Sequence, residues 1–267
     1  MLPLNNLIFA HRGIFDNKTI VENTIDAFKL CIKKKINIEL DIHQLNDNTI
    51  VVYHDYNLKR LTGIDKSIYD YSYKVLKKLK LLNTNQHIPR LNEVLSLVKG
   101  QILINIEIKN NNNFDNLYKE LDHLLTNYNG KIIIQSFFPD VVRKINKRKK
   151  YQCGLLINRK EKFVLNKLFL KHICPSFLAI SKDIINDIKK SFINNYKVLV
   201  WTIEYHKIEQ YKNVASSYIC NIKYGVQERI WTFSLFLRRE MLYPIKLPEH
   251  KELILIAINS MIFSPLF

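Results

Sequence analysis

The sequence predicts an α/β fold, a (β/α)8 TIM barrel, on the basis of three observations. Short apolar runs of strand length alternate with segments of helical periodicity from residue 102 to residue 222, which is the pattern of parallel strands joined by crossover helices. Two earlier apolar runs bring the number of such strands to eight. The length of 267 residues is typical of one such barrel, and the hydrophobic fraction of 47% can fill a large core.

The first part of the chain contains the two early strands and a helix. Leu7–Ala10 is a short apolar run that predicts the first strand. Asn23 or Thr24 can cap a helix that ends near residue 34. The second strand follows at once and contains two acidic residues, which are considered below.

The remaining strands and helices alternate regularly. We expect strands at Ile102–Ile108, Ile132–Gln135, Gln152–Ile157, Phe177–Ser181, Val198–Thr202 and Tyr218–Ile222. The helices expected between them are Phe114–Tyr128, Pro139–Lys149, Glu161–Lys171, Ile184–Asn194 and His206–Asn213. Because consecutive strands are joined by helices, the sheet is expected to be parallel.

Residues 55–89 interrupt this alternation. They are polar and rich in Tyr and Lys, without a strong strand pattern. Because this segment follows His54 directly, we expect it to border the mouth of any site to which His54 belongs.

The end of the chain differs in composition from the barrel, which we expect to occupy residues 1–225. Residues 226–267 are rich in aromatic side chains and are broken by prolines. A final barrel helix is expected within Gln227–Arg239. The apolar run Leu253–Phe263 is too short to span a bilayer, and it can pack on the barrel, lie on a membrane surface or be disordered. Packing on the barrel is the first choice.

Two acidic residues and a histidine occur close together near the second strand. Glu39 and Asp41 alternate with apolar residues, so in a strand both side chains point to one face. His54 follows the next apolar run, Thr49–Tyr53. Two carboxylates and a histidine suit a divalent cation and a proton donor, although a solvated strand face has the same pattern.

Other polar residues converge with these if the fold is a barrel, because function lies at the C-terminal ends of barrel strands. The residues expected at strand ends are His11 and Arg12, then Glu39 and Asp41, then His54, then Glu107 and Lys109, and finally Gln135 and Trp201. Three converging carboxylates would repel one another without a cation. We therefore expect Glu39, Asp41 and Glu107 to hold Mg²⁺ or Ca²⁺, since both ions prefer oxygen ligands.

Five short motifs occur in a fixed order. They are His11-Arg12-Gly13, Glu22-Asn23-Thr24 with Ala27-Phe28, Glu39-Leu40-Asp41, His54-Asp55 followed by Leu58, Arg60 and Thr62, and Ile106-Glu107-Ile108-Lys109. In this order and at this spacing they resemble the glycerophosphodiester phosphodiesterase family, from about Leu7 to about Gly225. The resemblance implies the barrel fold, metal ligation by the three carboxylates, and catalysis by His11 and His54. It also implies that residues 55–89, after the His54 strand, are a short insertion beside the substrate entrance.

The remaining site residues are expected to bind or support the substrate. Arg12 and Lys109 carry positive charge for a phosphodiester, and Arg12 can bind two phosphate oxygens. Glu22 is expected to hold the first loop by bonding to backbone amides or to Arg12. Trp201 is expected to form an apolar wall against the glycerol moiety, and Gln135 to support the site. At the last strand the chain has Asn221 where family members often have Asp, so no role is assigned to it.

The composition restricts the partners and the compartment. The formal net charge is +17, but the lysines are spread over many segments without a nucleic-acid-binding motif, so no specific nucleic acid is expected. Weak association with a membrane surface is compatible with this charge. Four widely spaced cysteines fit no metal-binding pattern, and the N-terminus has no signal-like segment, so we expect a cytoplasmic protein.

The resemblance thus implies a metal-dependent phosphodiesterase that hydrolyses deacylated phospholipids to glycerol 3-phosphate and an alcohol. A lysophospholipase D acting at the membrane surface is the alternative within the same chemistry. A catalytically inactive basic barrel that binds lipid or nucleic acid is the alternative from another class. The head-group preference, the roles of the two histidines, the nucleophile and the oligomeric state are left open.

Overall fold

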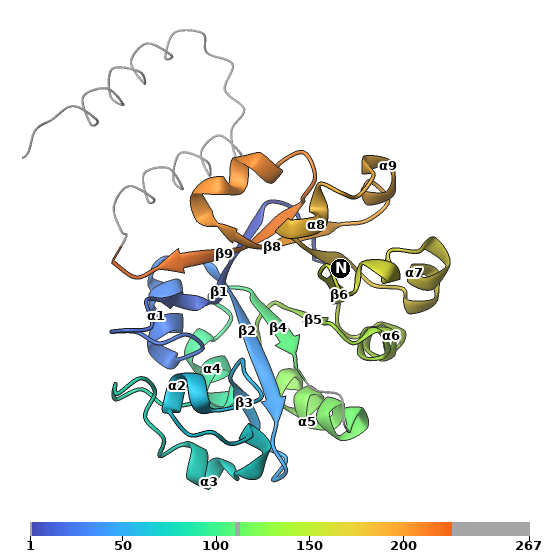
Figure 1. Ribbon diagram of the computed structural model, residues 1–267. Helices are drawn as coiled ribbons and strands as arrows, with labels where there is room; N and C mark the ends of the chain where they lie inside the picture. Colours follow the sequence, from blue (N-terminus) through green and yellow to red (C-terminus); the bar gives the residue numbers. More distant parts are fainter. Residues whose placement is uncertain (1, 110–112, 226–267) are drawn as a thin grey trace, which may run out of the picture. The chain divides into compact units, whose positions relative to one another are not determined.

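The computed structural model describes residues 2–109 and 113–225, and these form a closed barrel of eight parallel strands. Its strands are β1 (Leu7–Phe15), β2 (Asn37–Gln44), β4 (Ile104–Ile108), β5 (Ile132–Ser136), β6 (Cys153–Ile157), β7 (Leu178–Ser181), β8 (Val198–Glu204) and β9 (Ser217–Lys223). Each strand pairs with the next, and β1 closes the ring by pairing with both β2 and β9 (Figure 1). The predicted TIM barrel is confirmed.

Helices lie outside the strands, as the sequence pattern predicts. They are α1 (Ile25–Lys33), α4 (Leu91–Val98), α5 (Phe114–Thr126), α6 (Pro139–Lys147), α7 (Lys167–Ile173), α8 (Lys182–Ile185) and α9 (Lys190–Ile193). In α1 the side chain of Thr24 accepts a hydrogen bond from the Ala27 amide, and Ala27, Phe28 and Cys31 face the core. The cap predicted at this position is therefore present.

Three helices differ from their predicted extents. The segment expected as one helix from 161 to 171 is a 3₁₀ turn, η2 (Lys162–Val164), followed by α7, because Asn166 caps a new helix by accepting from two backbone amides. The segment 184–194 is split into α8 and α9, since Asn186 and Asp187 are poor helix formers. The last predicted helix is the 3₁₀ helix η3 (Tyr205–Tyr211).

The short strand β3 (Ile50–Val52) is not part of the ring. It pairs antiparallel with β2, with Ile42 opposite Val52, and occupies the end of the sheet order. The expectation that His54 ends a barrel strand is therefore wrong. The physical reason is the length of the connection, because only a few residues separate β2 from β3 and a parallel crossover needs about a dozen.

Residues 55–89 contain α2 (Lys59–Thr62), a 3₁₀ turn η1 (Ile68–Asp70) and α3 (Tyr73–Leu76). Although the segment is polar on average, it has a small apolar core of its own that continues beneath β3. The buried members of this cluster are Val21, Leu45, Val51, Tyr53, Leu58, Leu61, Ile68, Leu76, Leu81 and Ile88. The insertion is thus packed against the β2–β3 hairpin and the loop after β1 (Figure 1).

The chain separates into two units, Met1–Gly225 and Val226–Phe267. The helix expected within Gln227–Arg239 and the apolar run Leu253–Phe263 lie outside the described residues. Between residues 2 and 225, none of the described helices has the length and hydropathy that crossing a membrane requires.

Candidate active site

The His-Arg-Gly motif forms an irregularity in β1 rather than a regular strand end. Ala10 pairs with Cys220 and Ile14 pairs with Ile222, so β1 has two more residues than β9 in this interval. Arg12 and Gly13 accommodate them with φ angles of +57° and +86°. A Cβ atom at Gly13 would lie 2.9 Å from Cβ of Ala27, so only glycine fits between β1 and α1.

His11 is oriented by Asn221 on the neighbouring strand β9. Nδ1 of His11 lies 3.0 Å from Oδ1 of Asn221. Because an amide oxygen only accepts hydrogen bonds, Nδ1 carries the proton and Nε2 keeps its lone pair. Burial, with the charge of Arg12, lowers the pKa of His11 to about 4. His11 is therefore neutral near pH 7, and Asn221, to which sequence reasoning assigned no role, contacts it directly.

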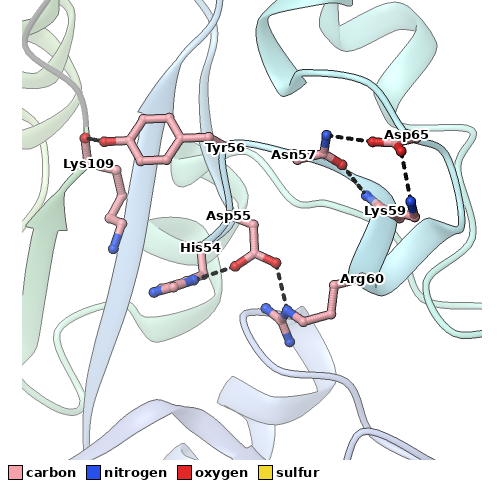
Figure 2. Close-up of a pocket in the computed structure, with 8 residues that line it drawn as sticks. All are labelled: His54, Asp55, Tyr56, Asn57, Lys59, Arg60, Asp65 and Lys109. Carbon is pink, nitrogen blue, oxygen red and sulfur yellow. Dashed lines mark hydrogen bonds and ion pairs between the residues drawn. The ribbon is translucent and has the colours of Figure 1, made fainter.

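His54 is held by a carboxylate rather than an amide. Nδ1 of His54 lies 2.5 Å from Oδ1 of Asp55, and Nε of Arg60 lies 2.6 Å from the other oxygen of Asp55 (Figure 2). Burial alone would raise the pKa of Asp55, but the bonds from His54 and Arg60 outweigh it and lower the pKa well below its usual range. The His54 ring thus faces an ionised carboxylate.

Glu22 connects the two histidine-bearing segments. Its carboxylate accepts from Arg12 at 2.8 Å, from Arg60 at 2.7 Å and from Asn17 at 2.8 Å. Burial opposes ionisation, but the bond from Arg60 and the charge of Arg12 lower the pKa of Glu22 to about 2. Glu22 therefore stays charged and ties the loop after β1 to the insertion through Arg60.

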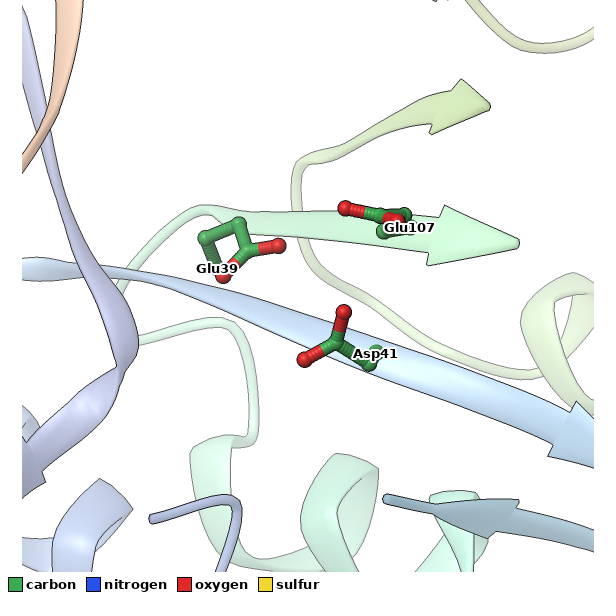
Figure 3. Close-up of side chains that lie close together, drawn as sticks. All are labelled: Glu39, Asp41 and Glu107. Carbon is green, nitrogen blue, oxygen red and sulfur yellow. The ribbon is translucent and has the colours of Figure 1, made fainter. Parts of the chain in front are cut away.

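Glu39, Asp41 and Glu107 form a buried acidic cluster, in which one oxygen from each side chain lies within 4.8 Å of the others (Figure 3). Asp41 and Glu107 are direct partners in the β2–β4 ladder. Burial and the charges of Asp41 and Glu107 raise the pKa of Glu39 well above its usual value. Oδ1 of Asp41 is buried without a hydrogen-bond partner. An additional cation would satisfy this oxygen and keep Glu39 ionised.

Two basic side chains border the cluster. Nζ of Lys109 lies 2.7 Å from Glu107 and 3.5 Å from Asp41, and Nε of Arg12 lies 3.5 Å from Asp41. Burial would lower the pKa of Lys109, but Asp41 and Glu107 raise it, so the amine stays charged. The Lys109 ion pairs to both acids are therefore present together.

The charges of the site do not balance. Its carboxylates are Glu22, Glu39, Asp41, Asp55 and Glu107, and its permanent cations are Arg12, Arg60 and Lys109. If all five acids are ionised, the carboxylates outnumber the permanent cations by two charges. A divalent cation would neutralise this excess, so the donor set fits such an ion in both charge and ligand type.

The match to known families decides the classification. Residues 11–221 match the glycerophosphoryl diester phosphodiesterase family. The chain belongs to this family. It is 30% identical over 227 residues to a glycerophosphodiester phosphodiesterase of Caldanaerobacter subterraneus subsp. tengcongensis, which covers 75% of this chain and 87% of the relative.

Two further comparisons extend this result. Over 133 residues the chain is 37% identical to the human lysophospholipase D GDPD1, which covers 45% of this chain and 41% of that protein. The crystal structure of a glycerophosphodiester phosphodiesterase from Thermotoga maritima has a TM-score of 0.69 at 24% identity, covering 86% of this chain and 98% of that one. At this identity the structural likeness supports the fold.

In this family member an apolar wall stands opposite the charged residues. Trp201 and Phe137 pack edge to face with ring centroids 5.6 Å apart, and the indole nitrogen of Trp201 donates to the carbonyl of Ala179 at 2.9 Å. They line a cavity of about 60 Å³ together with His11, Arg12, Glu39, His54, Glu107, Lys109, Gln135, Leu156, Thr202 and Ile219. The site residues predicted from the sequence thus line one cavity, with two exceptions. Asp41 does not line it but pairs with Arg12 and Lys109, which do. Glu22 does not line it either but binds Arg12.

Two polar side chains, Gln135 and Asn23, orient the acids. Gln135 donates to Glu39 at 3.4 Å and accepts from Asn105 at 3.0 Å. Asn23 donates to Asp41 at 2.8 Å. Asn105 was not predicted as a site residue, because a single asparagine in an apolar strand has no recognisable pattern.

His43 is a further residue that sequence reasoning left out. It is buried, its Nε2 lies 3.3 Å from the carbonyl of His54, and its Nδ1 lies 2.7 Å from the hydroxyl of Tyr69. A ring that donates from Nε2 and accepts at Nδ1 satisfies both contacts without a charge. Burial accordingly lowers the pKa of His43 to about 4. His43 therefore fixes the backbone of His54 from inside the β2–β3 hairpin.

Proposed function

We propose that this chain hydrolyses glycerophosphodiesters, the deacylated phospholipids, to glycerol 3-phosphate and an alcohol. One observation carries the proposal: two histidines with different hydrogen-bond partners face one cavity that also contains carboxylates and two basic side chains. Cleavage of a phosphodiester needs a base, an acid and compensation of phosphate charge. The family of the chain is consistent with this reaction.

Glu39, Asp41 and Glu107 would hold a divalent cation, Mg²⁺ or Ca²⁺. The Asp41 oxygen that lacks a hydrogen bond, the raised pKa of Glu39 and the excess negative charge support this assignment. When bound, the ion supplies positive charge that polarises the phosphate. The choice between the two ions depends on ligand number and geometry, which three carboxylates alone leave open.

Arg12 and Lys109 would bind the phosphate oxygens on the same side of the cavity. Arg12 is fixed by Glu22, and its backbone amide donates to Glu39 at 3.1 Å, so its position is set before substrate arrives. Lys109 is fixed by Glu107. Preorganised cations of this kind stabilise charge that develops on the phosphoryl oxygens.

The partners of the histidines support different roles for them. His11 has a neutral amide partner and a free lone pair on Nε2, so it would act as the base that removes a proton from the nucleophile. His54 is oriented by the carboxylate of Asp55, and we assign it the complementary role of donating a proton to the oxygen of the departing alcohol. The nucleophile is a water molecule or a hydroxyl of the substrate's own glycerol.

The other residues would support the substrate. Trp201 would pack against the glycerol carbons, Gln135 would orient Glu39, and Glu22 would hold Arg12 and the first loop. We further propose that the activity resides in residues 1–225 and that the insertion, residues 55–89, borders the mouth of the site.

The decisive assay measures release of glycerol 3-phosphate from glycerophosphoethanolamine, with and without a chelator. We expect turnover that chelation abolishes and that Mg²⁺ or Ca²⁺ restores. No release under any metal condition would contradict the proposed function and would favour an inactive basic barrel. All the proposed reacting groups are present in the cavity, which argues against such an inactive protein.

A lysophospholipase D is the second candidate, favoured by the similarity to the human enzyme over 133 residues. An acyl chain needs a continuous apolar path, which contributes about 0.8 kcal/mol per buried CH₂. The open depression next to His54 has mainly apolar exposed surface, but the charged groups of Lys59, Arg60 and Asp65 lie along it (Figure 2). The apolar residues of the insertion are buried in their own cluster.

We therefore expect a higher kcat/KM for glycerophosphocholine than for lysophosphatidylcholine, measured below the micelle concentration of the latter. A preference for the acylated substrate that is lost when residues 251–267 are deleted would reverse this assignment.

Location and partners are also proposals. A reducing, cytoplasmic location is supported by Cys31, Cys153 and Cys220, which are buried free thiols, and by the free thiol of Cys174. Any nucleic-acid binding is expected to be weak and steeply salt-dependent, because the basic residues are dispersed. We also propose a weak association with a membrane surface, and we assign no oligomeric state.

A further inference from the structure

Two large apolar side chains are exposed on one short segment. Phe163 in η2 is 78% exposed, and Leu168 in the first turn of α7 is 79% exposed. Their neighbours Val164, Leu170 and Ile173 already supply the buried contacts of this segment. The fold therefore gains nothing from an aromatic ring at 163 or a leucine at 168, and both groups are available to a partner.

This segment begins at the rim of the proposed active site. It follows β6, which ends at Ile157, and Leu156 of that strand lines the catalytic cavity. It is anchored to the next loop, because Arg159 donates to the carbonyl of Asp183 at 2.9 Å and Lys162 pairs with Asp187 at 3.4 Å. The exposed groups thus have a fixed position at the C-terminal end of the barrel.

The charge around the two apolar groups is strongly positive. Residues 158–171 contain five basic residues, Arg159, Lys160, Lys162, Lys167 and Lys171, and a single acid, Glu161. Lys160, Lys167 and Lys171 form no ion pair with any residue in the described part of the chain. Exposed apolar side chains on a segment with unpaired lysines complement an anionic lipid surface, into which the apolar groups insert while the lysines meet the head groups.

We propose that Phe163, Leu168, Lys160 and Lys167, here called the rim patch, dock the protein onto anionic phospholipid bilayers. A bilayer is favoured over a second copy of the chain, because two copies with a net charge of +17 would bring like charges together at this patch. Docking through the rim patch would bring the C-terminal end of the barrel, where the cavity lies, towards the membrane. The proposal does not depend on which substrate the site hydrolyses.

The contribution of the two apolar side chains of the rim patch is tested by sedimentation of the full chain with vesicles of phosphatidylcholine, alone or mixed with phosphatidylglycerol. We expect binding only to the mixed vesicles, and about tenfold weaker binding for Phe163→Ser/Leu168→Ser because two inserted apolar groups are lost. The matched control is Val75→Ser, which alters another exposed apolar residue, 42% exposed, on α3. It should bind like the wild type.

The contribution of the two lysines of the rim patch is tested with the variant Lys160→Gln/Lys167→Gln in the same sedimentation experiment. Each basic residue near an anionic surface strengthens binding about fivefold, so this variant should bind at least tenfold more weakly. Lys77→Gln/Lys78→Gln removes the same net charge at exposed positions beside α3 and should bind within about twofold of the wild type.

Turnover of a water-soluble glycerophosphodiester is measured in every variant. Selective loss of vesicle binding in the two rim-patch variants, with turnover unchanged, supports the proposal. No vesicle binding by the wild type, or equal binding by the rim-patch variants, would overturn it. A concentration-dependent dimer that the rim-patch substitutions dissociate would show instead that a second copy covers the patch, and would also overturn it. Because turnover is measured separately, failure of docking is distinguishable from failure of the proposed hydrolysis.

Discussion

Asn221 gives the sharpest test of the proposed base. Its amide oxygen is the partner of Nδ1 of His11 at 3.0 Å, and it does not line the cavity. A net hydrogen bond is worth about 0.5–1.5 kcal/mol, which corresponds to a factor of about 2–10 in the population of the correctly oriented ring. Asn221→Ala should therefore lower kcat by about 2–10-fold with little change in KM. His11→Ala should lower it by about 10²-fold or more.

The variant Asn221→Asp tests the charge of the partner. A carboxylate beside Nδ1 favours the protonated ring, so the pKa of His11 rises from about 4 towards and above its ordinary value. Because the base acts in its neutral form, more of the enzyme becomes inactive on the acid side. The acid limb of the pH dependence of kcat/KM should move to higher pH by about one pH unit or more.

The assay is release of glycerol 3-phosphate over a range of pH. Asn195→Ala is the matched control, since it removes an exposed amide that bonds only to nearby backbone carbonyls. The proposed role of His11 would be refuted if Asn221→Asp left the pH profile unchanged while Asn221→Ala kept full kcat. Near-UV circular dichroism and the melting temperature show whether each variant retains the fold.

Three other predictions follow from the site. Glu39→Ala should reduce turnover and metal affinity together, measured by activity and by calorimetric metal titration, and full activity after exhaustive chelation would contradict the metal assignment. His54→Ala should lower kcat by about 10²-fold with an unchanged circular dichroism spectrum, and near-normal turnover would exclude a two-histidine mechanism. Gly13→Ala should destabilise the protein by about 1–3 kcal/mol in urea unfolding, because φ at Gly13 is +86° and an added Cβ would lie 2.9 Å from Cβ of Ala27. An unchanged urea midpoint would show that the irregularity in β1 can relax.

The barrel could be predicted because its strands are buried, and buried strands consist mainly of apolar residues. Strands such as Ile132–Ser136 are surrounded by packed neighbours, and this leaves a continuous apolar run in the sequence. The antiparallel direction of β3 is a matter of connection length, which the apolar pattern does not encode. The splitting of the helix expected at 161–171 depends on one capping side chain, Asn166.

The candidate site was predictable where several polar residues form a local pattern, as in His11-Arg12-Gly13. Asn221 and Arg60 were noted in the sequence but were given no role, because their contacts act across the fold. Asn221 contacts a histidine 210 positions away, and Arg60 reaches Glu22 from the insertion. The spacing of a motif does not show such a partner, because each contact depends on the closure of the ring or on the packing of the insertion.

The attachment of β3 has a consequence for the order in which function and fold are lost. The eight-stranded ring is closed without β3, which pairs with β2 on one side and has an isolated bridge from Val51 to Arg90 on the other. It continues into the small apolar core of the insertion. A hairpin with so few ladder contacts can open as a local unit while the ring persists. Opening removes the proposed proton donor His54 and its partners, but leaves Glu39, Asp41 and Glu107 in place on ring strands. Opening of this peripheral unit is therefore enough to remove the proposed proton donor. The three carboxylates proposed to hold a cation separate only when the barrel itself unfolds.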